Sequence, residues 1–382
     1  MTRRQEQLHN LAPALLPWYF ANGRSMPWRD DPTPYHVWLS EIMLQQTRIE
    51  AAKPYYLRFL REIPDVASLA AADPEKLHKL WEGLGYYSRV KNLQAAARQI
   101  MEEYGGKFPE DASEIRKLKG IGDYTAGAIA SICFDKPAPA VDGNVLRVLS
   151  RITGDTRPIT DEKTRKEIRA ELAGVYPSHD RGAFTQAIME LGEVTCIPNG
   201  EPDCAHCPCA DFCVSKGGGW KDLPVKAPKK ERRKEQMTVF LLQCGEKTAV
   251  HKRGETGLLS GLWEFPNVPG ALNKEEAFAQ TEAWGCGPAP ADAVSDGADK
   301  NTRDASEMSE AAVKKNRAGG QKSACLQAVS EEKPRTHVFT HVEWDMKCYR
   351  VNCTKMPELF TWADITEIKE QYALPTAFRK FL

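Results

Sequence analysis

The chain has 382 residues, of which 42% are hydrophobic and 27% charged, and this composition predicts a soluble globular protein of two or three domains. Lysine and arginine number 52, as do aspartate and glutamate, so any binding of a polyanion must depend on a local basic surface. No apolar run approaches the roughly 18 residues of a membrane span, and MTRRQEQLHN is not a signal peptide, so we expect a cytoplasmic protein.

A helical pattern extends over residues 8–104, interrupted by turn signals. Within it, the segment VWLSEIMLQQ at 37–46 places apolar side chains around most of a helix, which should therefore be nearly buried. The segment carries Glu41. Because burial disfavours the charged form, Glu41 is a candidate general acid with a raised pKa. The alternative is a glutamate on a rim or in a structural ion pair.

The segment WEGLGYYSR at 81–89 places two glycines before Tyr86, Tyr87 and an arginine. This combination suits a loop that stacks on bases and contacts phosphate. The alternative is that the paired tyrosines belong to the core.

A helical hairpin is predicted at 118–126. A short helix with Ser113 as N-cap ends near Leu118, and the next helix starts near Asp123. Gly120 and Gly122 can take the positive φ values of a tight turn, and the free N–H groups there can bind a phosphate. Simple helix packing is the alternative for a G-x-G turn.

Asp142 stands just before an apolar stripe formed by Val145, Leu146, Val148, Leu149 and Ile152. Its ordinary role is a helix N-cap, and the helix dipole should keep it ionised. A neutral Glu41 with a charged Asp142 would suit cleavage of a glycosidic bond. The sequence leaves open whether the two are neighbours.

Five of the eleven cysteines lie within 196–213, which indicates a metal site rather than disulfides. The spacing C-x7-C-x2-C-x5-C is formed by Cys196, Cys204, Cys207 and Cys213. Four thiolates suit zinc or a [4Fe–4S] cluster, and composition does not decide between them. His206 and Cys209 are spare ligands.

Residues 221–235 are basic and read as a linker that could contact the phosphate backbone. Strand patterns follow at 237–242, 249–252 and 338–351, so residues 236–382 should form a second domain of α/β or α+β type. Residues 287–333 are rich in small and charged residues and are expected to be a disordered insertion.

Together these motifs resemble the adenine DNA glycosylases of the MutY family, in the helix-hairpin-helix superfamily that includes endonuclease III. The resemblance rests on MPWRDDPTPYHVWLSEIMLQQTRIE, WEGLGYYSRVKNL, LKGIGDYTAGAIAS, AVDGNVLRVLSRI, MELG, the cysteines, TGLLSGLWEFP and HVFTH. It implies a multidomain protein. An all-α helix-hairpin-helix catalytic domain at 1–220 would hold a [4Fe–4S] cluster in its 196–213 loop, and an α+β Nudix-like domain would follow.

The resemblance also implies a function: a monomer that excises adenine mispaired with 8-oxoguanine or guanine in double-stranded DNA, and that is nucleoid-associated if bacterial. Glu41 would protonate N7 of the flipped adenine, and Asp142 would stabilise or capture the sugar cation. The residues assisting there would be Tyr124, Asn144 and Glu190. Other roles are implied for the duplex-inserting residues Gln46 and Tyr86 and for the 8-oxoguanine-recognition residues Phe339, Thr340 and His341.

Strand-cutting relatives carry a lysine that forms a Schiff base where this chain has Tyr124, so the resemblance implies a monofunctional enzyme. Alternatives are an endonuclease III-like glycosylase/lyase, a non-catalytic DNA-binding iron–sulfur protein, and a Nudix hydrolase. No Glu-rich box follows TGLLSGLWEFP, which disfavours the last. The chain departs from the family pattern in its seven-residue first cysteine gap and in Lys119, where proline is frequent.

Overall fold

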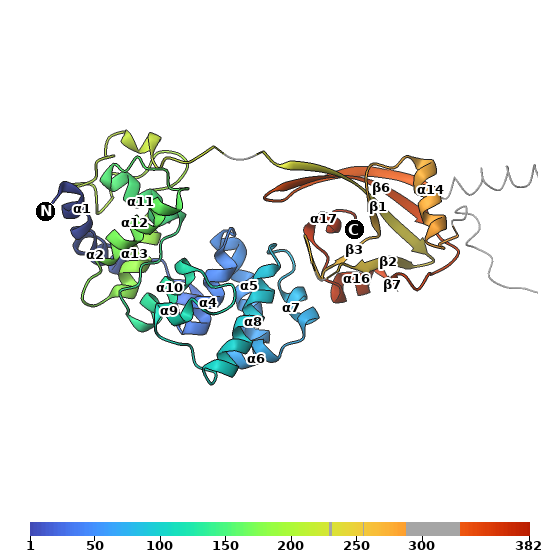
Figure 1. Ribbon diagram of the computed structural model, residues 1–382, viewed down its shortest axis with the longest axis horizontal. Helices are drawn as coiled ribbons and strands as arrows, with labels where there is room; N and C mark the ends of the chain where they lie inside the picture. The colour runs from blue at the N-terminus through green and yellow to red at the C-terminus, as the bar shows by residue number, and fades with distance from the viewer. Residues whose placement is uncertain (229–230, 255, 288–328) are drawn as a thin grey trace, which may run out of the picture. The chain divides into compact units, whose positions relative to one another are not determined.

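The protein is described here from a computed structural model, which defines residues 1–228, 231–254, 256–287 and 329–382. The chain divides into two compact units (Figure 1). Unit 1 comprises Met1–Leu80 and Tyr87–Lys229, and unit 2 comprises Trp81–Tyr86 and Lys230–Leu382. Within the described ranges, no helix combines the length and apolar character needed to cross a bilayer.

The regular structure described in unit 1 is helical, as the periodicity predicted. Its elements are α1 (Arg3–His9), α2 (Leu11–Asn22), α3 (Pro27–Asp30), α4 (Pro34–Leu44), α5 (Ile49–Glu62), α6 (Val66–Ala71), α7 (Pro74–Leu80), α8 (Ser88–Glu103), α9 (Ala112–Ile115), α10 (Asp123–Phe134), α11 (Gly143–Thr153), α12 (Glu162–Ala173), α13 (Arg181–Val194) and the 3-10 helix η1 (Gly219–Asp222).

Helices α11 and α13 form the centre of one core of unit 1. The apolar stripe of α11 is buried against Phe184, Ile188 and Leu191 of α13. Burial of each such side chain contributes about 1.5–3 kcal/mol. The two helices approach closely at Gly192, where an added Cβ would lie 2.8 Å from the Cβ of Asn144. This contact therefore brings the end of α13 beside the start of α11.

A second close approach positions the segment before α11. Helix α10 packs against α4 and α13. At Gly127 an added Cβ would lie 2.3 Å from the carbonyl oxygen of Pro139, so only glycine lets this segment cross α10. The segment continues directly to Asp142.

Two parts of the predicted linker at 221–235 are ordered. The backbone oxygen of Leu223 accepts a 3.0 Å hydrogen bond from Arg151, and that of Val225 accepts a 2.9 Å bond from the N–H of Ile159. Strand β1 already begins at Arg233. The linker prediction was too long at both ends, because composition does not reveal such long-range backbone hydrogen bonds.

Unit 2 contains a seven-stranded sheet with the path β3-β2-β1-β6-β5, to which β4 pairs through β1 and β7 through β2. β1 and β6 are parallel, whereas the other pairs are antiparallel. The strands are β1 (Arg233–Cys244), β2 (Lys247–Lys252), β3 (Trp263–Glu264), β4 (Asn267–Pro269), β5 (Val329–Val338), β6 (Val342–Asn352) and β7 (Thr361–Ala363). The helices are α14 (Lys274–Ala283), α16 (Ile365–Gln371) and α17 (Thr376–Arg379).

Both faces of this sheet are covered. Successive side chains of β1 point to opposite faces and therefore pack in two different clusters. Val239 and Leu241 pack in the cluster that contains Phe378 of α17. Phe240 and Leu242 pack in the cluster that contains residues of α14. The α+β prediction is confirmed.

The predicted disordered insertion at 287–333 requires a correction. Most of it, 288–328, lies outside the described residues. Residues 329–333, however, begin strand β5, and Val329 is fully buried opposite Val351. The charged composition of this segment concealed a strand whose side chains are mostly exposed.

Candidate active site and cysteine centre

One pocket in unit 1 gathers most of the candidate catalytic residues. Its volume is about 1200 Å³, which is ample for a nucleotide base. It is lined by six residues that the sequence singled out: Glu41, Gln46, Tyr124, Asp142, Asn144 and Glu190. The fold therefore places Glu41 and Asp142 on the walls of the same cavity, a relationship that the sequence left open.

Glu41 reaches this pocket from the buried helix α4. The helix begins after Thr33, whose hydroxyl accepts a hydrogen bond from the N–H of His36, and Trp38 and Leu39 are completely buried. The Tyr124 hydroxyl donates a 2.6 Å hydrogen bond to Oε2 of Glu41. Burial raises the pKa of Glu41 to about 7, although the bond from Tyr124 lowers it. The raised pKa expected from the apolar helix is confirmed.

Asp142 is the N-cap of α11, as predicted, and its Oδ1 accepts a 2.8 Å hydrogen bond from the N–H of Val145. We predicted that capping favours the ionised carboxylate, and the backbone hydrogen bonds at the cap do lower its pKa. Burial raises the pKa of Asp142 above its usual value despite the backbone bonds from Val145 and Asn144. The sequence showed the cap but not the depth at which the carboxylate lies.

The side-chain amide of Asn144 lies between two carboxylates. Its Nδ2 donates to Oδ2 of Asp142 at 3.0 Å and to Oε1 of Glu193 at 2.9 Å. Its Oδ1 accepts a 3.0 Å hydrogen bond from Arg147. Glu193 and Arg147 were missed in the sequence, where neither follows a local pattern.

Glu190 lies in the pocket wall with its side chain completely buried. It accepts hydrogen bonds from both Arg24 and Arg29, the latter at 2.8 Å. Burial alone would raise its pKa, but these two arginines outweigh burial and lower it. Glu190 is therefore held ionised. Both arginines were missed, although the arginine-containing motif beginning at Met26 was noticed.

The hairpin differs in detail from its prediction. Asp111, not Ser113, caps α9, because its carboxylate accepts the hydrogen bond from the Ser113 N–H. Gly120 has φ 76°, but Gly122 has φ −96° and is the N-cap of α10. Only Gly120 therefore needs the conformational freedom of glycine.

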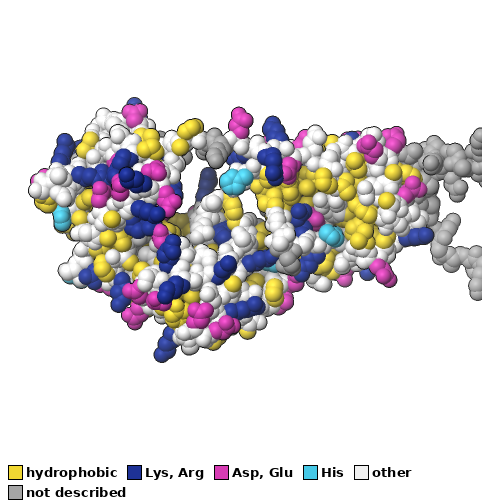
Figure 2. Space-filling model, viewed as in Figure 1, with side chains coloured by type: hydrophobic (Ala, Val, Ile, Leu, Met, Phe, Trp, Pro, Cys, Tyr) yellow, Lys and Arg dark blue, Asp and Glu magenta, His cyan; other side chains and the backbone are white. Residues whose placement is uncertain are grey.

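Gln46 and Tyr86 share an unusual backbone conformation. Both have positive φ, 59° and 46°, which is uncommon outside glycine. Such strain concentrates at functional sites. On the face drawn in Figure 2, Lys and Arg side chains are spread over the helical unit with acidic side chains among them.

In unit 2, residues Phe339, Thr340 and His341 form the turn between β5 and β6. The N–H of Phe339 bonds to the oxygen of Val342 at 2.8 Å and closes this turn. The Phe339 ring packs edge-on against Trp344 at 4.8 Å, which fixes the aromatic end of the turn.

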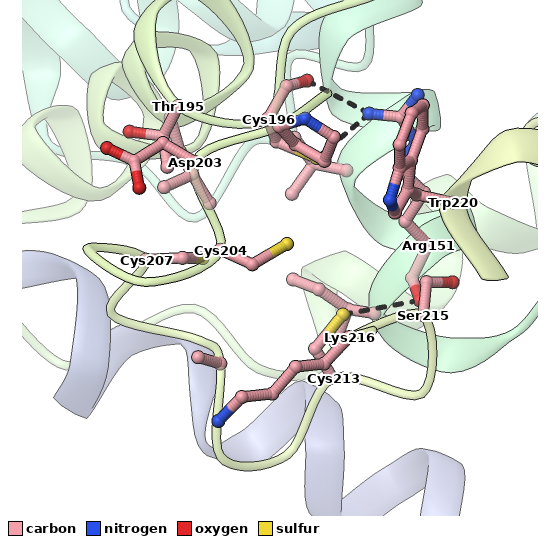
Figure 3. A pocket seen from close by; sticks show the side chains of 15 residues that line it. Arg151, Thr195, Cys196, Asp203, Cys204, Cys207, Cys213, Ser215, Lys216 and Trp220 are labelled. Atoms are coloured by element: carbon pink, nitrogen blue, oxygen red, sulfur yellow. Dashed lines mark hydrogen bonds between the residues drawn. The ribbon is translucent and has the colours of Figure 1, made fainter. Parts of the chain in front are cut away.

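The four predicted cysteine ligands line a separate hollow in unit 1, with Arg151 and Trp220 at its edge (Figure 3). Arg151 donates a 3.3 Å hydrogen bond to Sγ of Cys196. Cys209 is completely buried and does not line the hollow, and His206 bonds instead to Asp203. In the described residues, no three potential ligands converge as they would around one metal ion.

Comparison with known proteins matches a segment of each unit to a known family. Residues 39–173 match the family described as HhH-GPD superfamily base excision DNA repair protein, and residues 238–382 match the NUDIX domain family. The chain is 36% identical over 255 residues to an adenine DNA glycosylase of Buchnera aphidicola subsp. Schizaphis graminum, covering 66% of this chain and 73% of that protein.

The chain belongs to the adenine DNA glycosylase family.

Other relatives agree with this assignment. The mouse adenine DNA glycosylase is 36% identical over 338 residues, and the match covers 72% of this chain but 64% of the mouse protein. The human one is 34% identical, with 73% of this chain and 61% of that protein covered. A solved thermostable thymine-DNA glycosylase shares the fold with TM-score 0.50 and 23% identity, covering 55% of this chain and 96% of that chain.

Family membership confirms the resemblance drawn from the motifs and, with it, an enzyme class: DNA glycosylases hydrolyse N-glycosyl bonds. The helical repair domain followed by a Nudix-like domain is confirmed as well.

Proposed function

We propose that this chain is a monofunctional glycosylase that hydrolyses the N-glycosidic bond of adenine opposite 8-oxoguanine or guanine in duplex DNA. The observation that carries the proposal is the pairing of Glu41 and Asp142 in one pocket, with Tyr124 bonded to Glu41. A buried acid that stays neutral close to pH 7 and a nearby carboxylate are the groups such a cleavage requires.

The reaction would proceed on an adenine extruded from the helix, because its N7 and glycosidic bond are not accessible together within a base stack. Neutral Glu41 donates its proton to N7, and the bond to the sugar breaks with its electron pair moving to the base. The ionised Asp142 stabilises or captures the sugar cation. Water then adds at the sugar carbon and returns a proton, which leaves free adenine and an abasic site.

The remaining pocket residues suit a purine. Glu190, held ionised by Arg24 and Arg29, offers an acceptor to an exocyclic amine. Burial and the neighbouring Glu41 raise the pKa of the Tyr124 phenol well above its usual value, so Tyr124 remains a hydrogen-bond donor. A phenol cannot form the Schiff base that strand cleavage uses, which supports a monofunctional enzyme.

For the other predicted sites, we propose that Gln46 and Tyr86 enter the duplex beside the extruded base and that the Gly120–Gly122 turn binds phosphate. Phe339, Thr340 and His341 would recognise 8-oxoguanine from the β5–β6 turn. The enzyme would act as a monomer.

We propose a [4Fe–4S] cluster as the cofactor, held at the cysteine hollow. Its four thiols come from one short loop and line one hollow, and the Arg151 guanidinium donates a hydrogen bond to Sγ of Cys196. Cys196, Cys204, Cys207 and Cys213 would hold the cluster, and its bonds would tie together the two ends of their loop. Iron, sulfide and zinc analysis of the purified protein distinguishes the cluster from the zinc alternative.

The test is incubation with a duplex that carries one adenine opposite 8-oxoguanine, followed by alkali to cut abasic sites. We expect strand cleavage only after alkali. A duplex with thymine in place of the adenine is the control. Intact strands after alkali would overturn the proposed activity, whereas cleavage before alkali would overturn the monofunctional assignment.

A further inference from the structure

Glu193 lines the same pocket as Glu41, Asp142 and Glu190, but the proposed chemistry gives it no role. It lies in the last turn of α13 and lines the pocket opposite the first turn of α11. Its Oε1 accepts a 2.9 Å hydrogen bond from Nδ2 of Asn144. The same nitrogen donates to Asp142, so one amide connects the two carboxylates.

The surroundings of Asn144 allow its amide one orientation. A primary amide has two N–H donors, and here one points to Asp142 and the other to Glu193. The carbonyl oxygen faces the Arg147 guanidinium at 3.0 Å. A flipped amide would turn its oxygen toward two carboxylates and its N–H groups toward a cation. Glu193 and Arg147 together therefore exclude the flipped form.

Arg147 is itself fixed to the end of α13. It donates to the backbone oxygens of Gly192 at 2.7 Å and Cys196 at 2.9 Å. The close approach at Gly192 sets the distance between the helices. Glu193 thus stands on a rigid frame beside Asn144, although its own side chain is exposed to solvent.

We propose that Glu193 is a positioning residue: by holding the amide of Asn144 it aims one N–H at Oδ2 of Asp142 and fixes that carboxylate for the forming sugar cation. This inference rests on the proposed function. Without Glu193, the amide has one fewer acceptor and Asn144 can turn away from Asp142.

The charge of Glu193 has a second effect, because it faces Asp142 as a like charge and raises the pKa of Asp142. The other charged or titratable groups at the pocket include Glu41 of α4, Tyr124 of α10, Arg147 of α11, Arg165 of α12, Glu190 of α13, and Arg24, Arg29, Arg48 and Glu50. Loss of the Glu193 charge should therefore lower the pKa of Asp142.

The test compares Glu193→Gln with Glu193→Ala in the full chain, by single-turnover adenine release with enzyme in saturating excess, across a range of pH. Gln keeps an oxygen acceptor without the charge, whereas Ala removes both. We expect the acid limb of the profile to move to lower pH by about half a unit to one unit in both variants. On the plateau, Glu193→Ala should be slower by about five- to tenfold, and Glu193→Gln should match the wild type.

A double-mutant cycle separates positioning from a general structural effect. In an Asn144→Ala background, Glu193→Ala should cause no further loss of plateau rate. Glu162→Gln is the matched control, because Glu162 is an exposed glutamate paired with Lys166 on α12, and it should behave as the wild type.

Three outcomes would overturn the inference: an unchanged plateau in Glu193→Ala, an equal loss in Glu193→Gln, or an acid limb that moves in neither variant. Each of these requires a wild-type enzyme that releases adenine. A wild type that releases none would instead refute the proposed function, so the two failures are distinguishable.

Discussion

The Tyr124 hydroxyl lies 2.6 Å from Oε2 of Glu41 and donates its hydrogen bond to it. This bond lowers the pKa of Glu41, whereas burial, the larger effect, raises it to about 7. Tyr124 therefore limits the rise in the pKa of Glu41. Without this hydrogen bond, burial would raise that pKa further, and Glu41 would be a weaker acid.

Removal of that donor should shift the alkaline limb of the activity profile. In Tyr124→Phe, the pKa of Glu41 should rise further, and the limb should move to higher pH by about half a unit to one unit. Single-turnover rates against pH measure the shift. Tyr176→Phe is the control, because Tyr176 is a half-buried tyrosine whose hydroxyl is hydrogen-bonded to Thr185. A limb that stayed in place or moved to lower pH would contradict the role given to the Tyr124 bond.

Glu41 should also leave a signature in stability. Its pKa of about 7 in the folded protein exceeds the ordinary 4.5, so the folded state binds more protons between these values. Its contribution is complete below pH 4.5 and is lost as pH rises to about 7, with a slope of at most about 1.4 kcal/mol per pH unit. Denaturant unfolding of the wild type and Glu41→Gln should diverge accordingly. If the free energies of unfolding of the two proteins changed in parallel with pH, the raised pKa of Glu41 would be contradicted.

Asp142 combines a structural and a chemical task that one substitution separates. In Asp142→Asn, the amide oxygen can still cap α11 through the N–H of Val145, so stability should change by less than about 1 kcal/mol. Loss of the negative charge should slow adenine release by about a hundredfold or more. Calorimetry and single-turnover kinetics measure the two effects. Release at the wild-type rate would reduce Asp142 to a helix cap.

The two hairpin glycines should respond differently to alanine. Gly120 has φ 76°, and a Cβ there would lie 2.5 Å from the Cβ of Asn92, so Gly120→Ala should cost at least about 1–2 kcal/mol. Gly122 has φ −96° and open space around it, so Gly122→Ala should cost under about 1 kcal/mol.

The same pair tests the phosphate contact. If the free N–H groups at the start of α10 bind phosphate, the Gly122→Ala methyl should weaken binding to duplexes of any sequence while the protein stays folded. Fluorescence anisotropy with matched and mismatched duplexes measures this. Unchanged affinity would place the phosphate elsewhere.

The two ion pairs of Glu190 should contribute unequally to the stability of the fold. The Arg29 side chain is 15% exposed and that of Arg24 37%, while the Glu190 side chain is completely buried. Arg29→Met should therefore destabilise the fold by about 1–3 kcal/mol, because a buried carboxylate loses a partner. Arg24→Met should cost less. Urea unfolding compares the two, and an equal cost would mean that burial does not set their strength.

Local patterns in the sequence were sufficient to predict the raised pKa of Glu41 and the capping role of Asp142. An all-round apolar helix implies burial, and an aspartate before an apolar stripe implies a cap. The sign of the Asp142 pKa shift could not follow, because it depends on how deeply the tertiary fold buries the cap. The same limit applies to Arg24 with Glu190 and to Asn144 with Glu193, whose members are far apart in the chain.

The second unit was predicted less completely. The apolar run of β1 was visible, but β5 was hidden because its exposed residues are charged, like those of an insertion. Residues 223–227 belong to unit 1 but were read as linker, because their backbone groups form the hydrogen bonds to the rest of that unit and leave no mark on composition.

The parallel pairing of β1 with β6 has a consequence for how the chain is made. Residues 233–243 at the start of unit 2 pair with residues 342–352 near its end. The central ladder of the sheet therefore cannot form until the ribosome has synthesised the chain as far as residue 352. Unit 1 ends at Lys229, so its sequence is complete long before that point. We expect the helical unit to fold first during synthesis, while unit 2 waits for its last strands and folds more slowly.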